Sequence, residues 1–279
     1  MPELPEVETI RRQLAEHLAG RAIVAVTVAD PLLVEPETPR RFARALRGQR
    51  VREVGRRGKY LLLGLESGAT LALHLRMTGR LLWFPGRPAP PPDHVRARLG
   101  LDDGSTLVFS DVRRFGRAWL LPRDMPDPEG YWSRRVGIEP LGSDFTARRL
   151  GALLDRRRRP IKPLLLDQAL VAGIGNIYAD EALFQAGIHP RRPAGSLTPG
   201  EVRRLHRAIR DRLRAGLEAG GSSIDRYRDA NGEAGRMQDL LRVYGRAGSP
   251  CPRCGTPIAK IRVGQRGTYL CPRCQEAPC

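Results

Sequence analysis

The 279-residue sequence lacks the features that would place it in or across a membrane. It contains no run of about 18 apolar residues, the length that a transmembrane helix needs. Its first residues are acidic, so the basic segment and apolar run of a secretion signal are missing. We therefore expect a cytoplasmic protein, in which disulfide bonds would be unusual.

Lysine is also scarce. Only Lys59, Lys162 and Lys260 occur among the 48 lysine and arginine residues, and all the others are arginine. The net charge of +18 and the sequence pI of about 11.0 do not favour a compact fold, because like charges repel, and they suggest a polyanionic partner such as nucleic acid. Arginine is effectively always charged, whereas lysine can release a proton. A lysine in this arginine-rich sequence is therefore a candidate for a chemical role.

The hydrophobic pattern divides the chain into a strand-rich first part and a helical second part. Apolar residues recur at helical spacing near the start, which predicts a helix from near Pro5 to Gly20: Val7, Ile10, Leu14 and Leu18. Alternating apolar runs between about 20 and 120 predict an antiparallel β-sandwich. Its clearest part is a hairpin over 95–111 that turns at Asp-Asp-Gly.

After Phe145 the sequence predicts helices over 161–170, 176–187 and 198–219. Thr198 and Glu201 form a capping box at the start of the last one. Its arginine-rich face is either a solvated surface or a contact for a polyanion. The polar stretch 222–237 predicts a long, mobile loop that we expect to be disordered without its nucleic-acid partner.

Four of the five cysteines form two Cys-Pro-Arg-Cys motifs separated by 16 residues: Cys251, Cys254, Cys271 and Cys274. Two such knuckles on a hairpin can surround one Zn²⁺ with four thiolates. Two disulfides are one alternative, but they do not suit a chain without a secretion signal. A redox-active pair is the other, but the thioredoxin-like context that it needs is missing. Four protein ligands leave no open position, so we expect one structural zinc. Cys279 receives no role.

The amino terminus has a chemical and a purely structural interpretation. If Met1 is removed, Pro2 carries a free secondary amine whose pKa lies far below that of lysine. Such an amine can attack a sugar carbon and form a cationic iminium, with Glu3 moving a proton nearby and Glu6 one helical turn on. Alternatively, the prolines order the terminus and the glutamates complement the helix dipole.

Several long motifs occur in a fixed order along nearly the whole chain: MPELPEVETIRR (1–12), RRGKYLLL (56–63), HLRMTG (74–79), SDVRRFG (110–116), GIGNIYADEALFQAGIHP (173–190) and the four-cysteine segment. In these motifs the sequence resembles the bacterial formamidopyrimidine-DNA glycosylases, with the related endonuclease VIII family as the second choice. Leu4 and the zinc finger favour the first family, whose substrates are oxidised purines.

The resemblance implies an α+β fold with four parts. These are a catalytic antiparallel β-sandwich with a flanking helix (1–133), a linker (134–146), a helix–two-turn–helix domain (147–237) and a zinc β-hairpin finger (238–279). It implies a monomeric, nucleoid-associated DNA repair enzyme that binds double-stranded DNA between its domains. Zinc is the only cofactor that it implies.

The implied activity is that of a bifunctional DNA glycosylase and abasic-site lyase. It would excise 8-oxoguanine opposite cytosine and formamidopyrimidines by a Schiff base followed by β,δ-elimination. An oxidised-pyrimidine glycosylase like endonuclease VIII is one alternative. A non-catalytic zinc-finger protein that binds damaged DNA is another, since it would keep the charge and the cysteines without needing Pro2, Glu3 and Lys59 together.

The family pattern also implies individual roles. Pro2 matches the nucleophile, Glu3 the adjacent acid, and Lys59 a lysine on a strand that contacts the lesion and assists β-elimination. Glu6 would line the lesion pocket, and Arg266 matches a phosphate-binding arginine linked to δ-elimination. As an alternative, Lys59 would be an ordinary surface lysine before a buried strand.

A further set matches residues that contact DNA. Met77, Arg113 and Phe115 match the trio that fills the duplex when the damaged base is turned out, although Met77 and Phe115 taken alone would suit a core. Contacts with the DNA backbone are implied for five others: His94, Arg157, Lys162, Asn176 and Tyr244. Pro92 stands where many relatives have a histidine, which leaves the role of His94 open.

Overall fold

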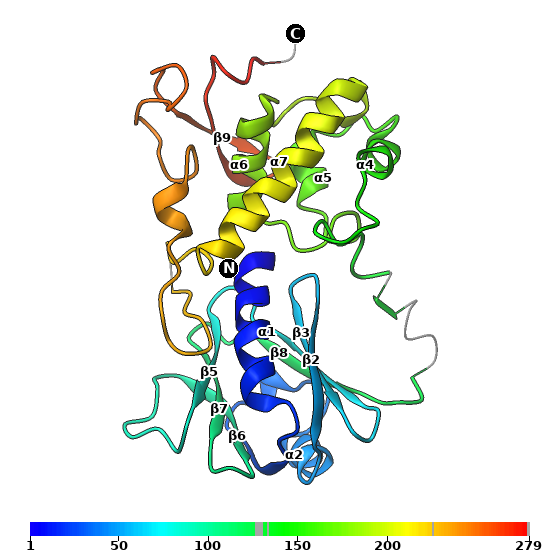
Figure 1. Ribbon diagram of the computed structural model, residues 1–279, viewed down its shortest axis with the longest axis vertical. Helices are drawn as coiled ribbons and strands as arrows, with labels where there is room; N and C mark the ends of the chain where they lie inside the picture. The colour runs from blue at the N-terminus through cyan, green and yellow to red at the C-terminus, as the bar shows by residue number, and fades with distance from the viewer. Residues whose placement is uncertain (126–130, 133, 225, 278–279) are drawn as a thin grey trace. The chain divides into compact units, whose positions relative to one another are not determined.

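The computed structural model describes residues 1–125, 131–132, 134–224 and 226–277, which fold into two compact units (Figure 1). The first unit comprises 1–128 and 219–236, and the second comprises 129–218 and 237–279. The expected domain boundary at residue 133 lies outside the described residues. In the part of the chain that is described, no helix combines the length and apolar character needed to cross a bilayer.

Two four-stranded antiparallel sheets form the body of the first unit, as the alternating pattern predicts. One sheet has the order β1 (Ile23–Val28), β6 (Val95–Leu101), β7 (Thr106–Asp111), β5 (Gly79–Phe84). The other has the order β2 (Val51–Arg57), β3 (Tyr60–Leu65), β4 (Thr70–His74), β8 (Arg117–Leu121). The hairpin of β6 and β7 turns at Asp102–Ser105, with Gly104 at a φ of 86° that glycine adopts without strain.

Helix α1 (Leu4–Leu18) packs on this body and buries the predicted stripe of Val7, Ile10, Leu14 and Leu18. Glu3 is its N-cap, and Glu6 completes a capping box. Two shorter elements, η1 (Pro31–Leu33) and α2 (Pro39–Leu46), follow β1. Residues of α1, α2 and both sheets share one hydrophobic core, so the position of α1 is fixed by apolar packing as well as by its cap.

The segment 219–236 returns to the first unit, although the sequence pattern assigned 222–237 to the helical domain. The Ala230 N–H donates to Gln13 on α1, and the Trp83 N–H on β5 donates to the Ala230 carbonyl. Tyr227 is buried in the same core. The described residues of this stretch thus make specific contacts within the first unit, and their disorder without DNA stays a prediction.

The second unit is helical and ends in a hairpin. Its elements are α4 (Ala147–Leu154), α5 (Ile161–Leu165), α6 (Asn176–Ala186), η2 (Ala194–Ser196), α7 (Pro199–Glu218), η3 (Met237–Leu240), β9 (Ala259–Val263) and β10 (Arg266–Leu270). Thr198 and Glu201 form the expected capping box, with the Thr198 N–H donating to Glu201 and the Glu201 N–H to Thr198.

Helix α5 is shorter than the sequence pattern predicts, since it ends at Leu165 and not near residue 170. The Asp167 side chain accepts the Ala169 N–H, and the Asp167 carbonyl accepts the Leu170 N–H. These local bonds offer the backbone a turn in place of another helical turn.

Candidate active site

The first residues of the chain are buried at the amino-terminal end of α1. Pro2, Glu3 and Glu6 are all buried, whereas Met1 is exposed. The Glu3 N–H donates to Glu6 Oε2 at 2.7 Å, so the backbone beside Pro2 is held by a charge-assisted bond. The stiff, acidic start of the sequence therefore corresponds to a fixed terminus rather than a frayed one.

Glu6 also links this terminus to the returning segment. Its Oε1 accepts the Ser222 N–H at 2.8 Å, and its backbone carbonyl accepts the Tyr227 hydroxyl at 3.3 Å. Gly221 has a φ of 88°, and a Cβ on it would lie 2.9 Å from the Glu6 side chain. Only glycine permits this approach, which explains why glycine occupies position 221.

Lys59 lies in the two-residue turn between β2 and β3, with its side chain largely buried. The expectation that it lies on a strand is corrected by one residue, since β3 begins at Tyr60. Gly58 has a φ of 55°, and its carbonyl accepts a bond from Arg56 Nη1 at 2.8 Å. Arg56 Nε lies 3.1 Å from Glu8 on α1, which ties the turn that carries Lys59 to the helix that follows Pro2.

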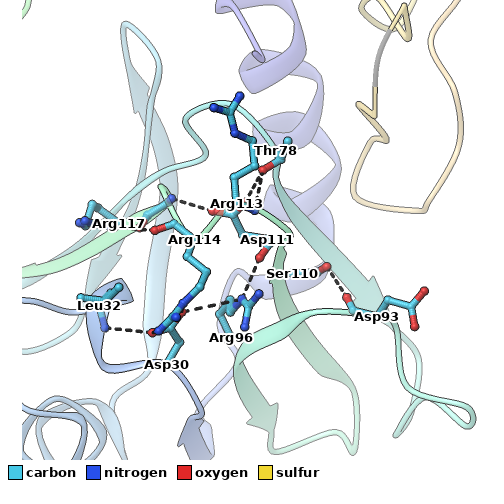
Figure 2. Close-up of polar contacts among 11 residues, drawn as sticks. Asp30, Leu32, Thr78, Asp93, Arg96, Ser110, Asp111, Arg113, Arg114 and Arg117 are labelled. Atoms are coloured by element: carbon cyan, nitrogen blue, oxygen red, sulfur yellow. Dashed lines mark hydrogen bonds and ion pairs between the residues drawn. The ribbon is translucent and has the colours of Figure 1, made fainter.

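Met77 lies half-buried in the turn between β4 and β5, and Arg113 and Phe115 are exposed in the loop between β7 and β8. The guanidinium of Arg113 lies over the Phe115 ring, 4.7 Å from its centroid. Figure 2 shows how the Asp111 carboxylate joins the two segments, since it accepts bonds from the Thr78 hydroxyl and from the Arg113 N–H. Asp111 thus connects the turn that carries Met77 to the loop that carries Arg113 and Phe115. Phe115 is exposed, so it is not a core residue.

His94 is exposed and has a φ of 56°. Its carbonyl accepts the Asp111 N–H, so its backbone helps to hold the β6–β7 end next to the Arg113 loop.

In the second unit, α6 and the start of β10 meet at one carbonyl. Asn176 is the first residue of α6, and its Nδ2 donates to the Gly267 carbonyl at 2.9 Å. Arg266, at the start of β10, is exposed beside that carbonyl. The structure thus brings the two predicted residues Asn176 and Arg266 together. An amide, an arginine and the N–H groups at the start of a helix are the groups that bind a phosphate.

Tyr244 is half-buried, with its ring centroid 5.0 Å from that of Tyr269 and its N–H donating to the buried carboxylate of Glu181. Arg157 is exposed after α4, where its Nε donates to the Leu153 carbonyl.

Lys162 does not lie where a DNA contact would. Its side chain is fully buried, and Nζ lies 2.7 Å from Asp180 Oδ1. Nζ also donates to the Thr268 hydroxyl at 2.8 Å and to the Gly267 carbonyl at 3.1 Å. The expected surface contact is corrected to an internal one, and it reaches the carbonyl that Asn176 also holds.

The four predicted zinc ligands converge, with all their Sγ atoms within 4.8 Å of one another: Cys251, Cys254, Cys271 and Cys274. Three of the separations are 3.9 Å, 3.5 Å and 3.5 Å. A tetrahedron with Zn–S bonds of about 2.3 Å has edges of about 3.8 Å, so the cluster fits one zinc ion with four thiolates. Cys279 lies outside the described residues.

Three family models match the chain in succession. They are described as the formamidopyrimidine-DNA glycosylase N-terminal domain (residues 1–118), the formamidopyrimidine-DNA glycosylase H2TH domain (136–228) and the zinc finger found in FPG and IleRS (248–277). The formamidopyrimidine-DNA glycosylase of Pelotomaculum thermopropionicum is 50% identical over 277 residues, which cover 99% of both chains. This chain belongs to the formamidopyrimidine-DNA glycosylase family. The family carries one structural zinc in its finger, as the cysteine spacing predicts.

Other members of the family are also similar to this chain over its whole length. The formamidopyrimidine-DNA glycosylase of a Roseiflexus species is 50% identical, covering 99% of this chain and all of the other. The solved structure of MutM (Fpg) from Thermus thermophilus is 45% identical, with a TM-score of 0.87 over 99% of this chain and 100% of that chain. That of Lactococcus lactis Fpg with DNA containing an abasic site is 37% identical, with a TM-score of 0.91 and the same coverage.

Sequence reasoning missed the carboxylates that hold these residues in place. Asp30, Asp111, Asp180 and Glu181 are all buried, and each accepts bonds from elements distant in the chain or across a loop. A buried acidic residue has no periodic signature. The only sequence signal is that Asp180 and Glu181 lie in the middle of a largely apolar helix.

Proposed function

We propose that this protein is a monomeric, nucleoid-associated DNA glycosylase and abasic-site lyase that excises 8-oxoguanine opposite cytosine and formamidopyrimidines. The observation that supports it most is the buried, hydrogen-bonded start of α1, where Pro2 and Glu3 lie in a chain 50% identical to a formamidopyrimidine-DNA glycosylase. Related Lactococcus lactis Fpg structures hold DNA with Fapy-dG, and a MutM structure holds DNA with carbocyclic 8-oxoG.

In this proposal, loss of Met1 frees the nitrogen of Pro2. Its lone pair forms a bond to C1′ as the glycosidic bond breaks, and the damaged base leaves with the bonding electrons and takes up a proton. Glu3 moves a proton to or from the sugar oxygen as the ring opens to an iminium. The iminium cannot lose an N–H proton, so it stays cationic and accepts electrons during elimination.

Elimination then breaks the strand on both sides of the sugar. Lys59, in the turn tied to α1 through Arg56 and Glu8, contacts the lesion and takes part in β-elimination. Arg266 and Asn176, which donates to the carbonyl of the residue after Arg266, hold a phosphate during δ-elimination. Glu6 lines the pocket for the lesion and links it to Ser222. His94, Arg157 and Tyr244 contact the DNA backbone.

Borohydride trapping on a duplex with 8-oxoguanine opposite cytosine tests this function. We expect a covalent adduct with the wild-type protein, and none with Pro2→Gln, which removes the secondary amine. Intact-mass analysis of the active preparation should show a chain without Met1. A protein that binds the duplex tightly but forms no adduct would instead be a non-catalytic damage-binding protein.

The substrate class needs a separate comparison. We expect faster cleavage of the 8-oxoguanine duplex than of an otherwise identical thymine-glycol duplex in single-turnover assays. The reverse order would assign the chain an activity like that of endonuclease VIII, even with the same proline chemistry.

A further inference from the structure

The loop 112–116, between β7 and β8, carries Arg113 and Phe115, two of the three side chains that the family resemblance assigns to insertion into the duplex. Phe115 is 45% exposed, and Arg113 lies over its ring. For these two side chains to project from the surface, the backbone of the loop must be held in one conformation. The contacts that hold it are drawn in Figure 2.

Asp111 closes the loop at its base. Its carboxylate is buried, with Oδ1 accepting the Arg113 N–H at 3.2 Å and Oδ2 accepting the Gly116 N–H at 2.7 Å. Gly116 has no room for a side chain, since a Cβ there would lie 2.5 Å from the Phe109 ring. Arg117 adds a second support, because its Nη1 donates to the carbonyls of Arg114 and Gly116.

The middle of the loop is held by a residue more than 80 positions away. Arg114 Nε donates to Asp30 Oδ2 at 2.7 Å, and Nη2 donates to Asp30 Oδ1 at 2.8 Å. This is a bidentate ion pair, the arrangement that fixes an arginine most firmly. Asp30 is only 4% exposed, and it is itself fixed as the N-cap of η1, where it accepts the Leu32 N–H.

Arg114 has a φ of 60°, a conformation that residues other than glycine adopt only when their surroundings impose it. With this backbone, the Arg114 side chain points down to Asp30 while Arg113 points to the opposite side of the loop (Figure 2). Arg96 joins the two anchors, since its Nε donates to the Asp111 carbonyl at 2.7 Å and lies 3.8 Å from Asp30.

We propose that Asp30 is a positioning residue for damage recognition: by holding Arg114, it fixes the loop so that Arg113 and Phe115 are presented outward for insertion into the duplex. Asp30 would thereby determine how strongly the enzyme discriminates between cytosine and adenine opposite the lesion. The inference rests on the proposed function, and it takes the insertion of Arg113 and Phe115 into the duplex from the family resemblance. Asp30 itself contacts no DNA in this scheme.

The rival role for Arg114 is a direct contact with a DNA phosphate. The two roles predict different behaviour. If Arg114 bound a phosphate, Arg114→Gln would lower the dependence of log affinity on log salt by about 0.9, and Asp30→Asn would not lower it, because it leaves the guanidinium in place. A positioning pair predicts that the two substitutions have the same effect and leave this salt slope unchanged.

The experiment compares Asp30→Asn, Arg114→Gln and the double variant with wild type. Glu37→Gln is the matched control, because it removes one negative charge from an exposed carboxylate in the same unit. Single-turnover excision is measured with 8-oxoguanine opposite cytosine and opposite adenine, and 2-aminopurine fluorescence beside the opposite base reports its unstacking. Thermal melting of each protein accompanies the assays.

We expect both single variants to lose about tenfold in excision opposite cytosine, in line with the cost of a misplaced binding group. Their preference for cytosine over adenine and the 2-aminopurine signal should fall together, and the double variant should match the singles. Borohydride trapping on a preformed abasic site should stay close to wild type, because Pro2 is untouched.

Wild-type discrimination in either Asp30→Asn or Arg114→Gln would overturn the proposal, as would additive losses in the double variant. Should Asp30→Asn melt too low to assay, Arg114→Gln, whose side chain is half-exposed, decides the matter alone. A wild-type protein without excision or trapping would refute the proposed function instead, so the two failures are distinguishable.

Discussion

Lys162 Nζ and Asp180 Oδ1 lie 2.7 Å apart, and neither side chain has any exposed surface. Asp180 Oδ2 accepts the Tyr269 N–H on β10, while Lys162 bonds to Thr268 on the same strand. The pair therefore fastens the zinc hairpin to α5 and α6. Burial raises the pKa of Asp180 to about 7, although Lys162 and the Tyr269 N–H act in the opposite direction.

Breaking this pair should be costly. Lys162→Met leaves Asp180 buried without its cation, and we expect the free energy of unfolding to fall by about 3–5 kcal/mol in urea titrations. Lys260→Met, at an exposed position on the same hairpin, is the control and should change it little. A Lys162→Met/Asp180→Leu double variant should be more stable than Lys162→Met alone, because no buried charge is left. Equal stability of Lys162→Met and wild type would contradict the role given to the pair.

Glu8 and Arg56 form the polar link between α1 and the turn of Lys59. Burial raises the pKa of Glu8, but bonds from Arg11 and Arg56 outweigh it and hold this pKa below its ordinary value. We expect Glu8→Gln to cost about 1.5–3 kcal/mol of stability at neutral pH, the value of hydrogen bonds to a charged group. Cleavage of an abasic-site duplex should slow by more than the loss of folded protein explains.

The pH dependence of Glu8 has a definite sign. Since its pKa is lower in the folded chain, its contribution is present above pH 4.5 and is lost as the pH falls through the folded pKa. The difference in stability between wild type and Glu8→Gln should therefore shrink on acidification. Glu16→Gln, at an exposed site on the same helix, should behave as wild type throughout.

His74 should make the fold sensitive to mild acid. Burial, followed by the nearby charges of Arg76 and Lys59, lowers its pKa from 6.5 to about 3. Below pH 6.5 the unfolded chain binds a proton that the folded chain does not, so His74 destabilises the fold by about 1.4 kcal/mol per pH unit until its folded pKa is reached. His74→Asn, which keeps an acceptor for the Arg76 N–H, should flatten this slope between pH 6.5 and 5. An unchanged slope would mean that other groups govern acid unfolding.

Gly216 lies inside α7, where helix propensity alone favours alanine by about 1 kcal/mol. A Cβ at this position would lie 2.3 Å from the Tyr178 hydroxyl of α6. We expect Gly216→Ala to lower the stability by about 1–3 kcal/mol through overpacking. Gly200→Ala, near the start of the same helix with nothing closer than 3.9 Å, should instead raise the stability by up to about 1 kcal/mol, and calorimetry of the two variants separates propensity from packing.

Zinc removal should unfold the hairpin. The hydrophobic cluster around it is small and includes Cys251 and Cys271 themselves, so the thiolate–zinc bonds supply much of its stability. Elemental analysis should give one zinc per chain. A strong chelator should abolish DNA binding and raise amide exchange over 248–277, with protection in 23–121 retained. Full DNA binding by zinc-free protein would show that the metal is dispensable.

Local spacing determined much of this protein in advance. The two Cys-x-x-Cys motifs, the capping box at Thr198 and the hairpin at 95–111 depend on residues a few positions apart. Short-range geometry is nearly independent of the rest of the chain, so their residues could be read directly. The order of the long motifs then led to the family.

Tertiary structure alone decided where the distant parts meet. The sequence could not show that 219–236 returns to the first unit, that Lys162 is buried against Asp180, or that Asp30 holds Arg114. The sequence does not distinguish a charged residue at the surface from one in the interior. The packing of the whole unit determines its partner, because a buried charge is stable only where folding places an opposite charge or several N–H donors next to it.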